Sequence, residues 1–111
     1  LMPQYGAPGD LFGQAVSVHG NRIIVAAPGA DGFPTTVSNA GAFHVFEFNG
    51  TQWAETVFVT SPNAVVNGAF AASVDLQGDV LVVGATGENG NRGRAYAYRN
   101  LTTFASPIAL N

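Results

Sequence analysis

Two stretches of the sequence match one another along their whole length, and this repeat decides the fold. The first is Phe12-Gly-Gln-Ala-Val-Ser-Val-His-Gly-Asn-Arg-Ile-Ile-Val-Ala-Ala-Pro28, and the second is Phe70-Ala-Ala-Ser-Val-Asp-Leu-Gln-Gly-Asp-Val-Leu-Val-Val-Gly-Ala-Thr86. Equivalent residues lie 58 positions apart, as the numbers of Phe12 and Phe70 show. A repeat of this kind indicates stacked structural units, because each unit needs a neighbour to bury its hydrophobic face.

The match continues after a change of spacing. Gly41-Ala-Phe-His-Val-Phe46 corresponds to Gly93-Arg-Ala-Tyr-Ala-Tyr98, now 52 positions apart, so the first copy carries six extra residues before Gly41. Trp53 and Phe104 end the match as an aromatic residue early in a final strand, and we expect both in the core between the units. The repeat therefore covers nearly the whole chain.

Each copy is predicted to form four strands. The Gly-Asn and Gly-Asp pairs at 20–21 and 78–79 suit two-residue type II′ hairpins. The apolar runs that follow them are typical of strands covered on both faces. The expected strands span residues 12–19, 22–27, 42–48 and 53–59 in the first copy and residues 70–76, 80–85, 94–99 and 104–110 in the second.

Four strands in each of two repeats predict an all-β fold of two four-stranded antiparallel β-propeller blades. We place the blades at residues 12–59 and 70–111, with residues 60–69 as the linker between them and residues 1–11 in the same place before the first blade. Residues 1–111 would then be one two-blade unit, cut within a linker. Such a unit is expected to be part of a larger closed propeller, either a ring of copies or a longer chain.

The composition excludes several classes of partner. The chain has 4 Lys+Arg and a net charge of -3, so it has no basic stripe for nucleic acid or for an anionic membrane surface. It has no apolar run near the roughly 18 residues of a spanning helix. The absence of cysteine excludes disulfides and thiolate metal sites. We therefore expect no nucleic-acid binding and no membrane insertion.

No pattern of residues predicts catalysis. His19 is expected at a hairpin turn and His44 within a strand, and neither has a nucleophile and an orienting group in evidence. The seven acidic residues are scattered and form no carboxylate pair of the glycosidase type. We predict no catalytic residue and no cofactor.

The repeat resembles the FG-GAP repeat, the blade unit of integrin α-subunit propellers and of many surface proteins. The marks are Asp10-Leu-Phe12-Gly13, Ala26-Ala-Pro28 and Gly41-Ala-Phe-His-Val-Phe46. In the second copy they are weaker, with Phe70-Ala71 and Gly84-Ala-Thr86. The resemblance implies an adhesive module at the cell surface or outside the cell.

Some integrin blades bind calcium in the loop between the second and third strands. Here Asp31 and Glu88 are the single carboxylates of the two corresponding loops. One carboxylate falls short of the six to eight oxygen ligands that Ca²⁺ takes. We predict no metal site.

Two blades alone would leave an apolar sheet face bare at each end, and exposed patches of that kind mark interfaces. We expect copies of the chain, or further blades of a longer chain, to cover these faces. Three or four chains would give a ring of six or eight blades, and contacts that do not close would give a filament. The predicted assembly residues are Ile23, Ile24, Val25, Leu81, Val82 and Val83.

The function predicted from these features is a non-enzymatic protein-interaction scaffold. The alternative is a lectin-like propeller that binds a saccharide through exposed aromatic and polar side chains. Its candidate ligand residues are Tyr5, Asp31, Phe33 and Asn91. Asn49 and Asn100 fit the N-glycosylation sequon and fall at equivalent turns, and at Asn49-Gly50 the hairpin is a sufficient explanation on its own.

Overall fold

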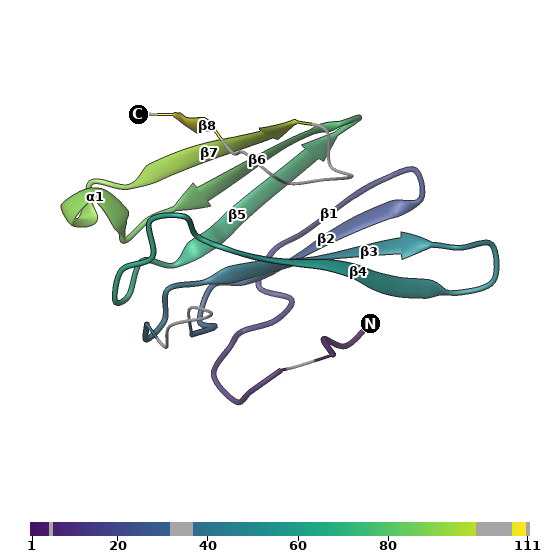
Figure 1. The fold of residues 1–111 in the computed structure, drawn as a ribbon, viewed down its shortest axis with the longest axis horizontal. Helices are drawn as coiled ribbons and strands as arrows, with labels where there is room; N and C mark the ends of the chain where they lie inside the picture. The colour runs from purple at the N-terminus through teal and green to yellow at the C-terminus, as the bar shows by residue number, and fades with distance from the viewer. Residues whose placement is uncertain (5, 32–36, 100–107, 111) are drawn as a thin grey trace.

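The computed structural model describes residues 1–4, 6–31 and 37–99, and the backbone of residues 108–110. In this part of the chain, two four-stranded antiparallel sheets follow one another in sequence (Figure 1). The first contains β1 (Val16–His19), β2 (Arg22–Ala27), β3 (Ala42–Phe48) and β4 (Trp53–Thr60) in that order. The second contains β5 (Phe70–Gln77), β6 (Val80–Ala85), β7 (Arg94–Arg99) and β8 (Ile108–Leu110) in that order. The predicted all-β fold of two antiparallel sheets is confirmed.

The elements agree closely with the repeat. Gly20 and Gly78 have φ values of 58° and 60°, while Asn21 and Asp79 keep negative φ, which is the sign pattern of a type II′ turn. The helical segment α1 (Glu88–Asn91) is a compact turn, because Asn89 and Gly90 have left-handed φ within it. None of the described helices is long and apolar enough to cross a membrane.

The ends of β4 and β5 each lie one residue beyond the expected bound, and two other expected strands differ more. The first strand begins at Val16 instead of residue 12, because Leu11 and Gly13 have positive φ values of 60° and 97° that interrupt an extended strand. In the last strand the structure describes only Ile108–Leu110. Phe104 and the rest of the expected 104–107 segment lie outside the described residues.

The hydrophobic core lies between the two sheets, whose faces are stacked on one another (Figure 1). Because side chains alternate along a strand, one face of each sheet supplies this core. Phe43 from the first sheet makes an edge contact with Tyr98 and a stacked contact with Phe70, with ring centroids 5.4 and 5.9 Å apart. The other large core residues are Ile24, Val45, Leu76, Leu81, Val83 and Tyr96.

This packing corrects the predicted assembly surface. Ile24, Leu81 and Val83 belong to the core between the two sheets of this same chain. Val25 is buried on the opposite face of the first sheet, where it pairs with His44 across the ladder. Of the six predicted residues only Val82 is exposed, and Ile23 is half-buried. Both faces of β2 are apolar, so the sequence pattern could not tell which residues face the other sheet.

Burial of Tyr98 makes the stability of the fold sensitive to alkaline pH. The pKa of the Tyr98 hydroxyl is raised far above its usual value, first by burial and then by the nearby Tyr96 and Glu88. Above a pH of about 10 the unfolded chain loses this proton while the folded chain keeps it. The free energy of unfolding is therefore unaffected below that pH and falls above it, by up to about 1.4 kcal/mol per pH unit.

We expect urea midpoints of the wild type to decrease from pH 9.5 upward, within roughly one unit of the ordinary tyrosine pKa. The Tyr98→Phe variant should show a smaller decrease over the same range. Equal slopes for the two proteins would contradict the assignment to Tyr98.

Candidate functional site

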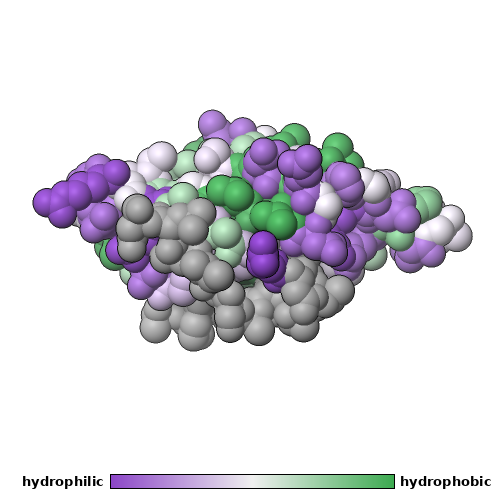
Figure 2. Space-filling model, turned by 90° about the horizontal axis from the view of Figure 1, so that it is seen from above, coloured by the Kyte–Doolittle hydropathy of each residue, from purple (hydrophilic) through white to green (hydrophobic). Residues whose placement is uncertain are grey.

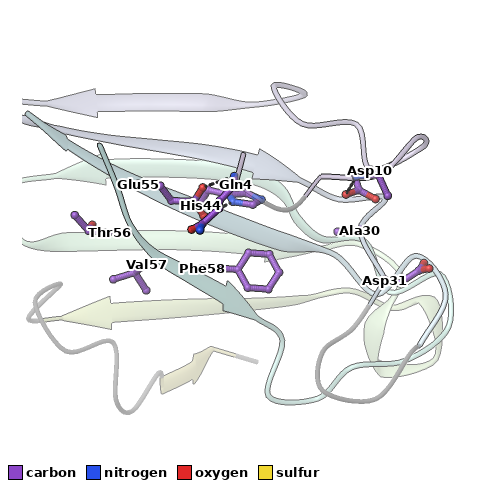
Figure 3. Close-up of a pocket in the computed structure, with 10 residues that line it drawn as sticks. Gln4, Asp10, Ala30, Asp31, His44, Glu55, Thr56, Val57 and Phe58 are labelled. Carbon is purple, nitrogen blue, oxygen red and sulfur yellow. Dashed lines mark hydrogen bonds and ion pairs between the residues drawn. The ribbon is translucent and has the colours of Figure 1, made fainter. Parts of the chain in front are cut away.

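A pocket of about 690 Å³ opens beside the first sheet, between β4 and the N-terminal segment (Figure 3). Its apolar wall includes Phe58 of β4, and its polar groups include the carboxylates of Asp10, Asp31 and Glu55. The imidazole of His44 also borders the pocket. The volume lies within the range of small-molecule sites.

The buried His44 is held by Glu55 and by two aromatic rings. Glu55 Oε2 lies 2.9 Å from His44 Nδ1, and Glu55 Oε1 accepts a hydrogen bond of 2.9 Å from the backbone N–H of Gln4. The ring of Phe12 makes an edge contact with the imidazole at 5.1 Å, and the ring of Phe58 lies 4.9 Å away. Glu55 therefore favours the tautomer with its proton on Nδ1 and connects the N-terminal segment to the sheet.

Among the described residues of the pocket, no hydroxyl group is hydrogen-bonded to His44. Among the described lining residues, Thr56 alone has a hydroxyl group, and its Oγ1 donates a long hydrogen bond of 3.4 Å to the carbonyl of Val45. Nucleophilic catalysis needs such a hydroxyl within hydrogen-bond reach of the base. The observed contacts of His44 are those of a packed side chain.

The predicted ligand residues are only partly brought together. Asp31 lines the pocket, and its Oδ1 accepts a hydrogen bond of 3.1 Å from the N–H of Asn39. Asn91 lies in α1, which connects β6 and β7, and it does not line the pocket. Tyr5 and Phe33 lie outside the described residues. Within the described part of the chain, no group of three or more His, Asp or Glu residues is suited to hold a metal ion.

Two further sequence expectations concern side chains at the β3–β4 hairpin. The Oδ1 of Asn49 accepts hydrogen bonds of 2.9 Å from both the N–H and the hydroxyl of Thr51, and one of 3.0 Å from the N–H of Gln52. These bonds are the turn chemistry expected there. Asn100 lies outside the described residues. Trp53 packs on Phe48 of its own sheet at 5.4 Å and is not part of the core cluster between the two sheets of this chain.

A buried hydrogen-bond cluster around the carboxylate of Glu88 was not predicted from the sequence. This residue is 1% exposed, and its two oxygens accept hydrogen bonds from the hydroxyls of Tyr96 and Ser61. Asn63 joins the cluster through hydrogen bonds of 3.0 Å to both hydroxyl groups. The carboxylate thereby ties the linker after β4 to the second sheet. The equivalents of Glu88 and Tyr96 in the first copy are Ala30 and His44, which line the pocket instead.

The contacts that join the two sheets form a compact set, which we call the blade junction. The linker donates backbone hydrogen bonds from Asn67 to Ser38, from Ala69 to Asn39 and from Phe70 to Ala40, with lengths of 2.9, 3.1 and 2.8 Å. Gly41 forms a parallel bridge with Phe70. At the edges of β1 and β5, Ser17 Oγ accepts a hydrogen bond of 2.9 Å from the N–H of Leu76.

Val25, His44 and Phe46 are buried on the outer face of the first sheet, but the outer faces of both sheets also carry exposed apolar side chains. Val16 and Val18 are both 62% exposed on the face of the first sheet that points away from the core. Val80 and Val82 are both 40% exposed on the outer face of the second sheet. We call the outer face of the first sheet, with Val16 and Val18, the first open face. The outer face of the second sheet, with Val80 and Val82, is the second open face. Seen from above, the molecule has hydrophobic residues in its middle with hydrophilic residues around them (Figure 2).

Comparison with known families agrees with the internal repeat. Residues 1–46 and residues 53–98 each match the model of a family described as the FG-GAP repeat. The two matches are displaced by 52 residues and together cover 92 of the 111 residues. No curated protein matched the chain.

Proposed function

The chain belongs to the FG-GAP repeat family, whose repeats are β-propeller blades, and on this basis we propose that it is a non-enzymatic scaffold that works by packing blade against blade. Its partners would be copies of itself or further blades of a longer chain. Repeats of this family are typical of adhesive proteins at the cell surface or outside the cell, and we propose such a location here.

The unequal burial of equivalent residues is the observation that carries this proposal. Ile24 of the first sheet is 0% exposed, whereas its equivalent Val82 is 40% exposed. In the other direction, Leu76 is 5% exposed and its equivalent Val18 is 62% exposed. The sequence keeps an apolar residue at each position, although only one member of each pair is covered within this chain. Apolar sheet faces of this kind favour association.

We expect the purified chain to associate as its concentration rises through the micromolar range. Multi-angle light scattering after size-exclusion chromatography measures the mass directly. The mass should increase with concentration, because association that buries apolar area follows mass action. A folded monomer of 11.4 kDa at every concentration would contradict self-association.

The pocket beside the first sheet favours a saccharide ligand as the alternative function. An exposed aromatic ring, that of Phe58, lies in the same lining as the carboxylates of Asp31 and Glu55. Sugar rings pack on aromatic faces while carboxylates accept hydrogen bonds from their hydroxyls. Because His44 and Phe58 share a face with Val16, a glycan array probed with the dilute, unassociated chain tests this alternative, and the absence of any bound glycan would remove it.

A further inference from the structure

Both halves of the blade junction occur a second time, at opposite ends of the two-blade unit. The first half is the donor segment, residues 67–71, in which Asn67, Ala69 and Ala71 have φ values of 60°, 53° and 70°. Its equivalent is the segment 9–13, where alternate residues again have positive φ: 88° at Gly9, 60° at Leu11 and 97° at Gly13. Leucine and alanine rarely adopt this conformation, because their Cβ atoms make it costly. The segment 9–13 therefore has the backbone shape of a donor.

The anchor of the donor segment to its own blade is repeated as well. The carbonyl of Gly68 accepts a hydrogen bond of 2.8 Å from the N–H of Gly87, and the equivalent carbonyl of Asp10 accepts one of 2.9 Å from Gly29. The aromatic ring that ends the segment also keeps its contact. Phe70 makes an edge contact with Tyr96 at 5.3 Å and 76°, and Phe12 makes one with His44 at 5.1 Å and 77°.

The second half of the junction is the acceptor loop, residues 38–41. Its equivalent, residues 90–93, keeps the asparagine and the glycine with the same conformation. The φ values are 54° at Asn39 and 65° at Asn91, and 96° at Gly41 and 88° at Gly93. A Cβ atom added at Gly41 would collide with the backbone of Phe70, whereas one added at Gly93 would have no atom closer than 3.9 Å. No described residue therefore occupies the place next to Gly93 that corresponds to Phe70.

The hydrogen bond between the edge strands β1 and β5, from Leu76 to Ser17, also has equivalent positions at the two open faces. Asp75 on the second sheet is the equivalent of Ser17, and it is exposed with two acceptor oxygens. Val18 is the equivalent of Leu76, whose N–H donates to Ser17. His19 and Arg22 flank the two-residue hairpin, so Val18 and Ile23 form the non-hydrogen-bonded pair that follows. The N–H of Val18 thus points away from β2 toward the open edge.

From these equivalences we propose that a second copy of this chain docks head to tail, with its donor segment 9–13 on the acceptor loop 90–93 of the first copy. The contact reproduces the blade junction, so Val18 N–H of one copy donates to Asp75 of the other, and the first open face covers Val82. This inference rests on the proposed scaffold function and adds the identity and the orientation of the partner.

The orientation follows from the chemistry of the two open faces. The first open face carries the donor segment and the aromatic ring of Phe12, while the second carries the acceptor loop and the small side chains of Ala95 and Ala97. The donor segment on the first open face fits the acceptor loop on the second open face. Two first faces, or two second faces, would not fit one another. The contact is therefore heterologous, and it can be repeated from copy to copy.

Mixing of two variants tests the orientation. Val18→Asp places a carboxylate on the first open face, and Val82→Asp places one on the second. Both side chains are exposed in the single chain, so the fold should be retained, which circular dichroism checks. Each variant alone is expected to associate at least roughly a hundredfold more weakly than the wild type, because docking would bury an unpaired carboxylate. An equimolar mixture should form a one-to-one dimer through the one intact pair of faces.

A matched control is Val66→Asp, which adds the same charge at a side chain 64% exposed on the linker, outside both sheets. It should associate as the wild type does. If the wild type and Val66→Asp associate but either face variant still dimerises alone, or the mixture gives no dimer, the head-to-tail orientation is wrong while the scaffold proposal stands. If the wild type itself remains monomeric, the proposed self-association fails and this inference fails with it.

Discussion

Replacing Gly41 with alanine is expected to lower the free energy of unfolding by about 3 kcal/mol or more. Gly41 has a φ of 96°, and its backbone bridges to Phe70 at the blade junction. A Cβ atom here would meet the backbone oxygen and nitrogen of Phe70 far inside van der Waals contact. Because backbone atoms cannot rotate away as a side chain can, the two sheets would have to separate. Urea denaturation at low protein concentration measures the effect.

Gly50 provides a matched control for the same substitution. Its φ is 104°, so alanine is strained there as well, but a Cβ atom at Gly50 would have no neighbour within 4 Å. Gly50→Ala should therefore cost only the conformational strain, about 1–2 kcal/mol. The difference between the two variants isolates the contact between the sheets. Equal losses of unfolding free energy would show that alanine at Gly41 costs only the backbone strain, and that the blade junction adjusts to the added Cβ atom.

The strands and hairpins could be predicted because they depend on local and periodic features. The spacing of 58 residues aligned two hairpins whose glycine and polar residue already determine the turn. The same local features predicted β2, β3, β6 and β7 with the bounds that the structure has. Where the local backbone is unusual, as at Leu11 and Gly13, the prediction placed the start of β1 too early.

The orientation of the sheets could not be predicted, because it depends on contacts between distant residues. After Arg22, the strand β2 is apolar on both faces, so nothing in it assigns Ile24 to the internal core and Val25 to the opposite side. The buried state of Glu88 depends on Ser61, which is 27 positions away. Likewise the pocket around His44 needs Glu55 and the N-terminal segment to be placed together. Contacts of this kind join residues that are far apart in the sequence, so they become visible only in the three-dimensional structure.

The equivalent residues Phe70 and Phe12 connect the stability of the single chain to its association. Phe70 is fully buried between Phe43 and Tyr96, so Phe70→Ala removes core contacts on both sides and is expected to cost about 3–5 kcal/mol. Phe12 contacts the rings of His44 and Phe46 within its own sheet, but no second sheet of the described residues covers its other side. Phe12→Ala should therefore cost only about 1 kcal/mol when the chain is dilute and monomeric.

This difference should shrink as the protein associates. If a second copy covers Phe12 as the first sheet covers Phe70, the loss caused by Phe12→Ala must increase with protein concentration, because association stabilises only the wild-type face. Denaturation series at several concentrations measure both losses, and Phe70→Leu replaces Phe70→Ala if the alanine variant does not fold. Similar losses for the two alanine variants in the dilute chain would contradict the unequal burial of the two rings. A loss for Phe12→Ala that is the same at every concentration would show that no partner covers this ring.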